Sequence, residues 1–334
     1  MKQEFDLKQI EKPLLSWFAG YARVLPWREE PTPYRVWVSE IMLQQTRVEA
    51  VKPYFERFTK ELPDVAALAA CSEERLLKLW EGLGYYNRVR NMQTAARTVM
   101  EEYDGRLPAD YEKLLTLKGI GSYTAGAVAS IAYGIPVPAV DGNVLRVIMR
   151  VTADDSDIMK QSVKSRVEKE LLAVIPKDAA GAFNQALMEL GATVCLPNGE
   201  PHCAQCPWES FCEARKQGIW QTLPVKSRAK PRRIEEKTVL IIRDGERIVL
   251  HKRGVKGLLA GLYEFPNLAG HLSEEEVLSY VREQDLVPVH IEKLEDAKHI
   301  FSHIEWHMTG YMVRVSELET EQSGLLFVEV EDSE

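Results

Sequence analysis

The stretch Leu117–Asn143 reads LKGIGSYTAGAVASIAYGIPVPAVDGN, and the rest of the chain is interpreted around it. It opens with Gly119 and Gly121, where one helical pattern stops and another starts. Because glycine allows a positive φ and a close approach of the backbone, this turn can direct its N–H groups at a phosphate. The stretch closes with Asp141, which precedes the apolar, helix-compatible run 144–151. A phosphate-binding hairpin followed by a carboxylate at a helix N-terminus indicates chemistry on nucleic acid.

Charge is divided unevenly along the 334-residue chain, whose net charge is −8. Residues 1–233 hold 32 Lys and Arg against 29 Asp and Glu, whereas residues 234–334 hold 10 against 21. A slightly basic first part can still bind phosphates, and an acidic second part limits indiscriminate binding. No stretch approaches the roughly 20 apolar residues of a membrane span, and the charged start MKQEFDLKQIEKP lacks the apolar core of a signal peptide. We therefore expect a soluble, cytoplasmic monomer without a membrane partner.

The hydrophobic periodicity changes once along the chain. Apolar residues at helical spacing predict an all-α domain over residues 1–215. Residues 216–237 lose this spacing and gather charge and proline, so we interpret them as a linker. Residues 238–334 then show a period of two, which predicts a small α+β domain. It should contain a β-hairpin at 238–251, a helix at 273–284 that begins with a capping box, and two strands within 298–315.

Two carboxylates stand in contrasting surroundings. Glu40 lies in the apolar run WVSEIM (37–42), and burial there should raise the pKa of its carboxyl group. Asp141 is predicted at a helix N-terminus, which favours the anion, so the two pKa values should be pushed apart. Such a pair can serve as proton donor and anionic stabiliser. Taken singly, Asp141 fits a plain helix N-cap and Glu40 a surface residue. Only the nearby Gly119–Gly121 hairpin favours the catalytic interpretation.

Four of the five cysteines fall within eighteen residues, as Cys195, Cys203, Cys206 and Cys212. Clustered cysteines of this kind differ from the scattered pattern of a disulfide framework. Their short spacings fit one site with four thiolate ligands, which holds either zinc or an iron–sulfur cluster. Spacing alone leaves both possibilities open.

The hairpin motif LxGxGxxTA (117–125), the downstream Asp141 and the four-cysteine segment occur together with further motifs: LPWR (25–28), VSEIMLQQT (38–46), WEGLGYY (80–86), AVDGN (139–143) and FNQA (183–186). In this combination the chain resembles the endonuclease III superfamily of helix-hairpin-helix DNA glycosylases. Within it, the chain resembles the adenine DNA glycosylases of the MutY family. The resemblance covers nearly the whole chain and places the helix-hairpin-helix at about residues 114–130.

The resemblance implies a base-excision-repair enzyme that binds double-stranded DNA, flips out an adenine paired with 8-oxoguanine or guanine, and hydrolyses its N-glycosidic bond. It implies that Glu40 protonates adenine N7 and later handles the water, and that Asp141 stabilises the oxocarbenium-like sugar. Tyr123 and Asn143 would position the site, and Tyr85 would wedge into the base stack. For Tyr85 and Trp27, core packing is the alternative. The other implied DNA or base contacts are Trp27, Arg28, Gln45, Thr46, Leu83, Gly84, Gly119, Gly121 and Gln185.

Two further implications follow from the same resemblance. Relatives that also cut the DNA backbone carry a lysine where this chain has Tyr123, and tyrosine cannot form a Schiff base with the sugar, so a monofunctional glycosylase is expected. In the family the four cysteines hold one [4Fe-4S] cluster, which implies the ligands Cys195, Cys203, Cys206 and Cys212. The first gap between cysteines has seven residues here, where the usual pattern has six.

The last part of the chain resembles a Nudix domain of the kind that recognises 8-oxoguanine in this family. The segment GLYEFP (261–266) matches the residues that precede a Nudix box, but the paired glutamates of the box are missing, so pyrophosphatase activity is not expected. Ser302, in the motif FSH (301–303), is the candidate for a hydrogen bond to the oxidised base, although the motif also fits simple alternation along a strand. Two alternatives remain open: a backbone-cutting glycosylase for oxidised pyrimidines, and a catalytically silent iron–sulfur DNA-binding regulator.

Overall fold

The computed structural model describes residues 5–227, 231–245, 247–254, 256–318 and 325–330. These residues form two compact units, and the boundary between the units follows Ser227. Among the described residues, the first unit buries two apolar clusters and the second unit buries one. None of the described helices is both long enough and apolar enough to cross a membrane.

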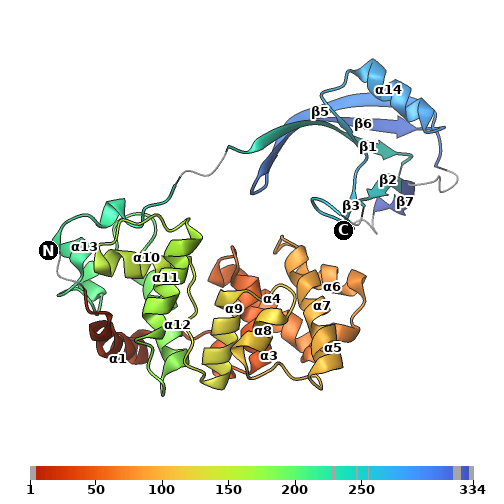
Figure 1. Ribbon diagram of the computed structural model, residues 1–334. Coiled ribbons are helices and arrows are strands. Elements are labelled where there is room, and N and C mark those ends of the chain that lie inside the picture. The colour runs from red at the N-terminus through yellow and green to blue at the C-terminus, as the bar shows by residue number, and fades with distance from the viewer. Residues whose placement is uncertain (1–4, 228–230, 246, 255, 319–324, 331–334) are drawn as a thin grey trace. The chain divides into compact units, whose positions relative to one another are not determined.

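The first unit is helical throughout its described residues (Figure 1). Its α-helices are α1 (Glu11–Tyr21), α2 (Pro26–Glu29), α3 (Pro33–Leu43), α4 (Val48–Glu61), α5 (Val65–Ala70), α6 (Glu73–Trp80), α7 (Asn87–Glu102), α8 (Tyr111–Thr116), α9 (Ser122–Ala127), α10 (Gly142–Thr152), α11 (Gln161–Leu172), α12 (Ala180–Thr193) and α13 (Glu213–Lys216). A π-helical turn, η2 (Val128–Ala132), continues α9, and short 3₁₀ turns are η1 (Leu7–Ile10), η3 (Cys203–Gln205) and η4 (Trp220–Thr222).

Two apolar cores divide this unit into lobes. The first lobe, α2–α9, buries one cluster that includes Trp37, Phe55 and Trp80. The second lobe, α1 with α10–α12, buries another that includes Phe183 and Trp208. In Figure 1 the red α1 lies beside the green α12, although the two helices are far apart in sequence. The chain therefore crosses between lobes after α1 and again between η2 and α10, and both crossings carry predicted site residues.

Local sequence explains the two helices that matter most for the site. Helix α3 begins at Pro33, whose fixed φ suits a first turn, and the side chain of Thr32 accepts a hydrogen bond from the Arg35 N–H. Most of its residues are buried, because apolar side chains occur on all its faces. Helix α10 begins after Asp141, whose side chain accepts from the Val144 N–H. The predicted helix over the run 144–151 is confirmed.

The second unit is a mixed sheet with one helix. Its strands are β1 (Arg233–Arg243), β2 (Arg247–Lys252), β3 (Tyr263–Glu264), β4 (Asn267–Ala269), β5 (Pro288–Ile300), β6 (Ile304–Val315) and β7 (Leu325–Glu329), and its helix is α14 (Glu274–Glu283). The strand order is β3-β2-β1-β6-β5, with β4 paired to β1 and β7 paired to β2. Within the described residues, β1 and β6 pair in parallel and the other strand pairs are antiparallel. Val277 and Val281 of α14 join the buried cluster of this unit.

Several predicted boundaries need correction. Strand β1 begins at Arg233, so the end of the predicted linker 216–237 belongs to the sheet, and Trp220–Thr222 form a turn of the first unit. The predicted strands at 298–315 are present, but β5 begins ten residues earlier, at Pro288. The capping box of Ser273 and Glu276 is confirmed. Strands β1 and β2 pair as the predicted hairpin, while Glu246 lies outside the described residues.

Candidate active site

A cavity of about 680 Å³ lies in the helical unit, and both lobes contribute to its lining. The first lobe contributes residues of α2, α3, the following turn and α9, and the second lobe contributes residues of α10 and α12. Its volume falls within the range of known small-molecule pockets, about 300–1,000 Å³. The predicted site residues that line it are Trp27, Arg28, Glu40, Gln45, Thr46, Tyr123, Asp141, Asn143 and Gln185.

Glu40 is a buried acid, 5% exposed, near the end of α3. Its Oε2 accepts a short hydrogen bond from the hydroxyl group of Tyr123 on α9. Burial raises the pKa of Glu40 to about 7, the negative charge of Asp141 adds to the shift, and the hydrogen bond from Tyr123 opposes it. The predicted upward shift of the Glu40 pKa is confirmed. At neutral pH this carboxyl group can therefore both give and take a proton.

Tyr123 is half-buried and lines the cavity between the two lobes. Besides Glu40, its hydroxyl group contacts the Met188 sulfur of α12 at 3.5 Å. Burial raises the pKa of Tyr123 well above its ordinary value, and the nearby carboxylates add to the shift. The residue therefore acts as a neutral hydrogen-bond donor that orients Glu40.

Asp141 accepts two hydrogen bonds in the cavity wall. Its Oδ1 accepts from the Val144 N–H at 2.7 Å, and its Oδ2 accepts from the Asn143 side-chain amide at 2.8 Å. Burial is nevertheless the larger effect and raises the pKa of Asp141, while both donors oppose the shift. The helix N-terminus favours the anion as expected, but burial outweighs it, so the expectation that the pKa values of Glu40 and Asp141 shift in opposite directions is wrong. Two fixed donors still stabilise the carboxylate and hold its orientation.

A chain of hydrogen bonds connects Asn143 to the cysteine segment. The Asn143 side-chain oxygen accepts from Nη2 of the buried Arg146 at 2.8 Å. The same nitrogen donates to the Gly191 carbonyl at 2.7 Å, and Arg146 Nε donates to the Cys195 carbonyl at 2.8 Å. Asn143 is thus fixed by both α10 and the end of α12.

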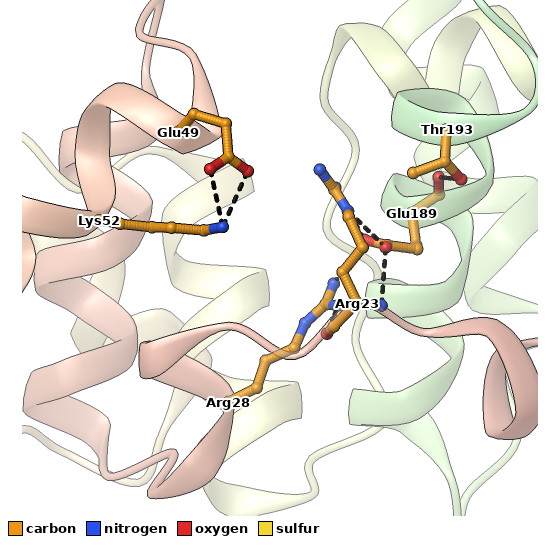
Figure 2. Close-up of polar contacts among 6 residues, drawn as sticks. All are labelled: Arg23, Arg28, Glu49, Lys52, Glu189 and Thr193. Atoms are coloured by element: carbon orange, nitrogen blue, oxygen red, sulfur yellow. Dashed lines mark hydrogen bonds and ion pairs between the residues drawn. The ribbon is translucent and has the colours of Figure 1, made fainter.

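A second buried carboxylate, Glu189 of α12, holds two arginines at the cavity wall (Figure 2). Arg23 donates to it through Nε at 2.7 Å and Nη2 at 3.0 Å, and Arg28 donates through Nη2 at 2.9 Å. Burial alone would raise the pKa of Glu189, but the hydrogen bond from Arg23 and the charge of Arg28 lower it overall. Figure 2 also shows the Glu49–Lys52 pair of α4. No local sequence pattern marks Glu189 or Arg23, because the residues that pair are more than 160 positions apart in the chain.

The remaining predicted contacts lie in different parts of the helical unit. Trp27 packs edge-on against Phe55 in the core and also lines the cavity, so its two interpretations are compatible. The Leu83–Tyr85 turn is not part of the cavity lining: Leu83 is buried, whereas Tyr85 is 48% exposed. Gly119 has φ +79 in the turn between α8 and α9, as expected for a glycine-dependent hairpin.

Comparison with known proteins relates this geometry to a family. Residues 38–177 match a family described as HhH-GPD superfamily base excision DNA repair protein, and residues 238–334 match a NUDIX domain. The chain is 34% identical to the adenine DNA glycosylase of Mus musculus, over 90% of this chain and 69% of that protein. It is 31% identical to the adenine DNA glycosylase of Buchnera aphidicola subsp. Acyrthosiphon pisum, over 90% of this chain and 85% of that protein. The chain belongs to the adenine DNA glycosylase family.

Other relatives agree with this assignment. The adenine DNA glycosylase of Homo sapiens is 37% identical over 87% of this chain, which spans 64% of the human protein. The helical unit is similar to a thermostable thymine-DNA glycosylase, with a TM-score of 0.56, 25% identity and coverage of 63% of this chain and 97% of that one. It is also similar to endonuclease III in a non-covalent DNA complex, with a TM-score of 0.54, 26% identity and coverage of 64% and 99%. The predicted fold class, a helix-hairpin-helix glycosylase domain with a Nudix-like domain, is confirmed.

The four cysteines of this family member line a second, smaller cavity together with Arg150 and Trp220. Arg150 Nη1 donates to the Cys195 sulfur at 3.3 Å. Burial raises the pKa of the Cys206 thiol to about 12, and the other three cysteines add to the shift. In the described part of the chain, no three His, Cys, Asp or Glu side chains are grouped closely enough to share a single metal ion.

Ser302, the predicted lesion contact, lies in the second unit between β5 and β6. It is exposed, and its hydroxyl group is 3.4 Å from Nδ1 of His303. The neighbouring Phe301 contacts the Trp306 ring edge-on, so the FSH motif forms a loop supported by an aromatic contact.

Proposed function

We propose that this protein removes adenine that is paired with 8-oxoguanine or guanine in duplex DNA, by hydrolysis of the N-glycosidic bond. One observation carries the proposal: Glu40 and Asp141, from different lobes, line one cavity whose volume suits a flipped nucleoside. Paired carboxylates with different roles are what glycosidic bond hydrolysis needs.

Glu40 is the proton donor in this proposal. Tyr123 donates to Oε2 of Glu40, so the proton of the neutral acid belongs on Oε1, the oxygen left free for adenine N7. Once N7 is protonated, adenine leaves as a neutral base. The ionised Glu40 then accepts a proton from the water that attacks the sugar.

Asp141 stabilises the positive charge that develops on the sugar. Its two donors, the Val144 N–H and the Asn143 amide, hold it in one orientation before the substrate arrives. Preorganised charge of this kind is generally a large contribution to catalysis. Arg28, Gln185 and the Gln45–Thr46 turn line the remaining wall and would contact the base or its backbone.

The proposed reaction is monofunctional, because position 123 carries tyrosine instead of an amine. A structural neighbour, endonuclease III, has been trapped in a covalent DNA intermediate. Tyr123 has no amine with which to form a Schiff base, and its hydroxyl group is engaged by Glu40. The strand should therefore stay intact until alkali cleaves the abasic product.

The decisive experiment uses duplexes in which adenine stands opposite 8-oxoguanine, guanine, cytosine or thymine, with and without alkali. We expect cleavage after alkali for the 8-oxoguanine and guanine duplexes, and none for the E40Q variant, which should still bind. Absence of adenine release from every duplex would contradict the proposed function. Strand cleavage without alkali, or efficient borohydride trapping, would contradict only the monofunctional mechanism.

We further propose that Cys195, Cys203, Cys206 and Cys212 hold one [4Fe-4S] cluster. The residues fit such a group, because four sulfurs surround a small cavity whose other walls include Arg150 and Trp220. Four thiolates at these spacings can hold either zinc or an iron–sulfur cluster, and the family resemblance favours the cluster. When bound, the cluster would order the segment that follows α12.

Iron and zinc analysis of the purified protein tests this assignment. We expect four iron atoms and inorganic sulfide per chain, broad visible absorption, and a lower unfolding temperature after the cluster is removed by chelation. Stoichiometric zinc without iron would contradict the cluster.

A further inference from the structure

Arg88, in the first turn of α7, joins two segments that are far apart in sequence. Its Nη2 donates to the carbonyl oxygens of Leu83 at 2.9 Å and Gly84 at 3.2 Å. Its Nη1 donates to three carbonyl oxygens at the end of α3, those of Ile41 (2.8 Å), Met42 (3.3 Å) and Gln44 (2.5 Å). One planar guanidinium group thus connects the end of α3 to the turn before α7.

The Arg88 charge has no acidic partner among the described residues. Burial lowers the pKa of Arg88 to about 10. The guanidinium carbon lies 5.4 Å from the ring centroids of both Trp80 and Tyr85. The last carbonyls of a helix lack intrahelical partners and carry partial negative charge, so they are suitable acceptors for a buried cation. Among the described residues, these carbonyls and the two rings surround the charge, while Nε of Arg88 is buried without a hydrogen-bond partner.

The turn that Arg88 holds is strained. Gly84 has φ +66 and Tyr85 has φ +49, so two consecutive residues are left-handed, and the second is not glycine. Such conformations persist only where surrounding contacts enforce them, and they cluster at functional sites. Here the Arg88 N–H donates to the Tyr85 carbonyl at 2.8 Å, and the Trp80 indole donates to the Gly84 carbonyl at 3.1 Å. The turn presents Tyr85 as one of the exposed large apolar side chains of the structure.

The other segment that Arg88 holds belongs to the active site. Helix α3 carries Glu40, and the residues after it, Gln44–Thr46, line the cavity. Gln45 has φ +60, so this turn is also left-handed at one residue. Two strained turns, one at the cavity and one bearing an exposed aromatic residue, therefore share a single hydrogen-bond donor group.

We propose that Arg88 is a positioning residue that fixes the Tyr85 turn to the end of α3. The family resemblance implies that Tyr85 inserts into the base stack, and Arg88 would then hold the Tyr85 turn and the end of α3, which carries Glu40, as one rigid element. The inference rests on the proposed function, because it assumes that the cavity receives a flipped adenine. Arg88 itself contacts neither base nor sugar in this account.

The test compares R88M and R88K with the matched control R57M. Arg57 belongs to the same lobe, donates to the Leu79 carbonyl at 3.4 Å and covers the Tyr54 ring at 4.7 Å, but it joins no site segment. Lysine keeps the charge but lacks the planar fork needed to reach both segments. Each protein is examined for unfolding temperature, single-turnover excision, and the fluorescence of 2-aminopurine placed opposite 8-oxoguanine, recorded before excision.

We expect R88M to slow excision about 100-fold, because small misplacements of reacting groups have effects of this size. R88M should also lose most of the increase in 2-aminopurine fluorescence. R88K should be intermediate, and R57M should match the wild type in both measurements even if its unfolding temperature falls. If R88M does not fold, R88K decides the question. Folded Arg88 variants with wild-type fluorescence and rate would overturn the inference. A wild type that releases no adenine would contradict the proposed function, and the inference with it.

Discussion

Glu40 is the residue whose local environment is most directly tied to its chemistry. It is neutral over part of the physiological range because its side chain is buried, and it keeps one oxygen engaged by Tyr123. The sequence predicted the direction of this pKa shift from the apolar neighbours alone. The corresponding prediction for the pKa of Asp141 was wrong. A helix N-terminus can be recognised in the sequence, whereas the burial that outweighs its effect depends on residues of other helices.

The raised pKa of Glu40 predicts a pH-dependent stability cost. The folded pKa of about 7 lies above the ordinary 4.5, so ionisation favours the unfolded chain as pH rises from 4.5 to 7, with a penalty of about 3 kcal/mol above pH 7. E40Q cannot ionise and should be more stable than the wild type by that amount near pH 8, with little difference near pH 4.5. Urea unfolding at both pH values measures the difference. An equal effect at the two pH values would contradict the shifted pKa.

Glu189 provides a second prediction at the scale of one residue. Its removal leaves Arg23 and Arg28 without their buried counter-charge, so E189Q should lower the free energy of unfolding by about 3–5 kcal/mol. E213Q, which breaks the exposed pair with Lys216, is the control and should change stability by less than about 1 kcal/mol. Denaturant titration compares the two variants. Equal small losses would show that the arginines find other partners.

At the scale of elements, sequence patterns predicted what is local. Helical spacing, the N-cap of α10 and the capping box of α14 depend on residues within a few positions and were identified. The start of β5 was missed, because most of its residues are exposed and it lacks the alternation of a half-buried strand. The roles of Arg88 and Glu189 were missed for another reason: their acceptors and donors are brought together only by packing of distant helices. Most of the other candidate site residues were predicted from the family resemblance and could not be predicted from composition alone.

The junction between α9 and the segment before α10 gives a prediction for an element. A Cβ on Gly126 would lie 2.2 Å from the Pro138 carbonyl oxygen, so glycine permits α9 to approach the chain that leads to Asp141. G126A should therefore lower stability by about 1–3 kcal/mol and separate Tyr123 from Asp141. G121A, at an open position, should leave stability nearly unchanged while weakening DNA binding. Unfolding and DNA titration of both variants distinguish packing from binding. A stable, fully active G126A would contradict the close-approach argument.

At the scale of the whole molecule, the two units divide the proposed task. All the residues that line the cavity belong to the helical unit, so the proposed excision chemistry is assigned to that unit. The second unit contributes the exposed FSH loop, in which the Ser302 hydroxyl lies 3.4 Å from Nδ1 of His303. Recognition of the oxidised base and removal of adenine should therefore be separable by mutation.

S302A tests this separation when combined with E40Q, which prevents excision during binding measurements. Loss of one hydrogen bond of about 1 kcal/mol should weaken binding to the 8-oxoguanine duplex about fivefold and leave binding to the guanine duplex unchanged. S279A, on the surface of α14 in the same unit, serves as control, because its hydroxyl group contacts only Glu283. Fluorescence anisotropy with both duplexes gives the two ratios. A contact that distinguishes the two bases must change one affinity relative to the other. An equal loss of affinity for both duplexes would therefore assign Ser302 to general DNA binding. Unchanged affinity for both would place lesion recognition at another residue.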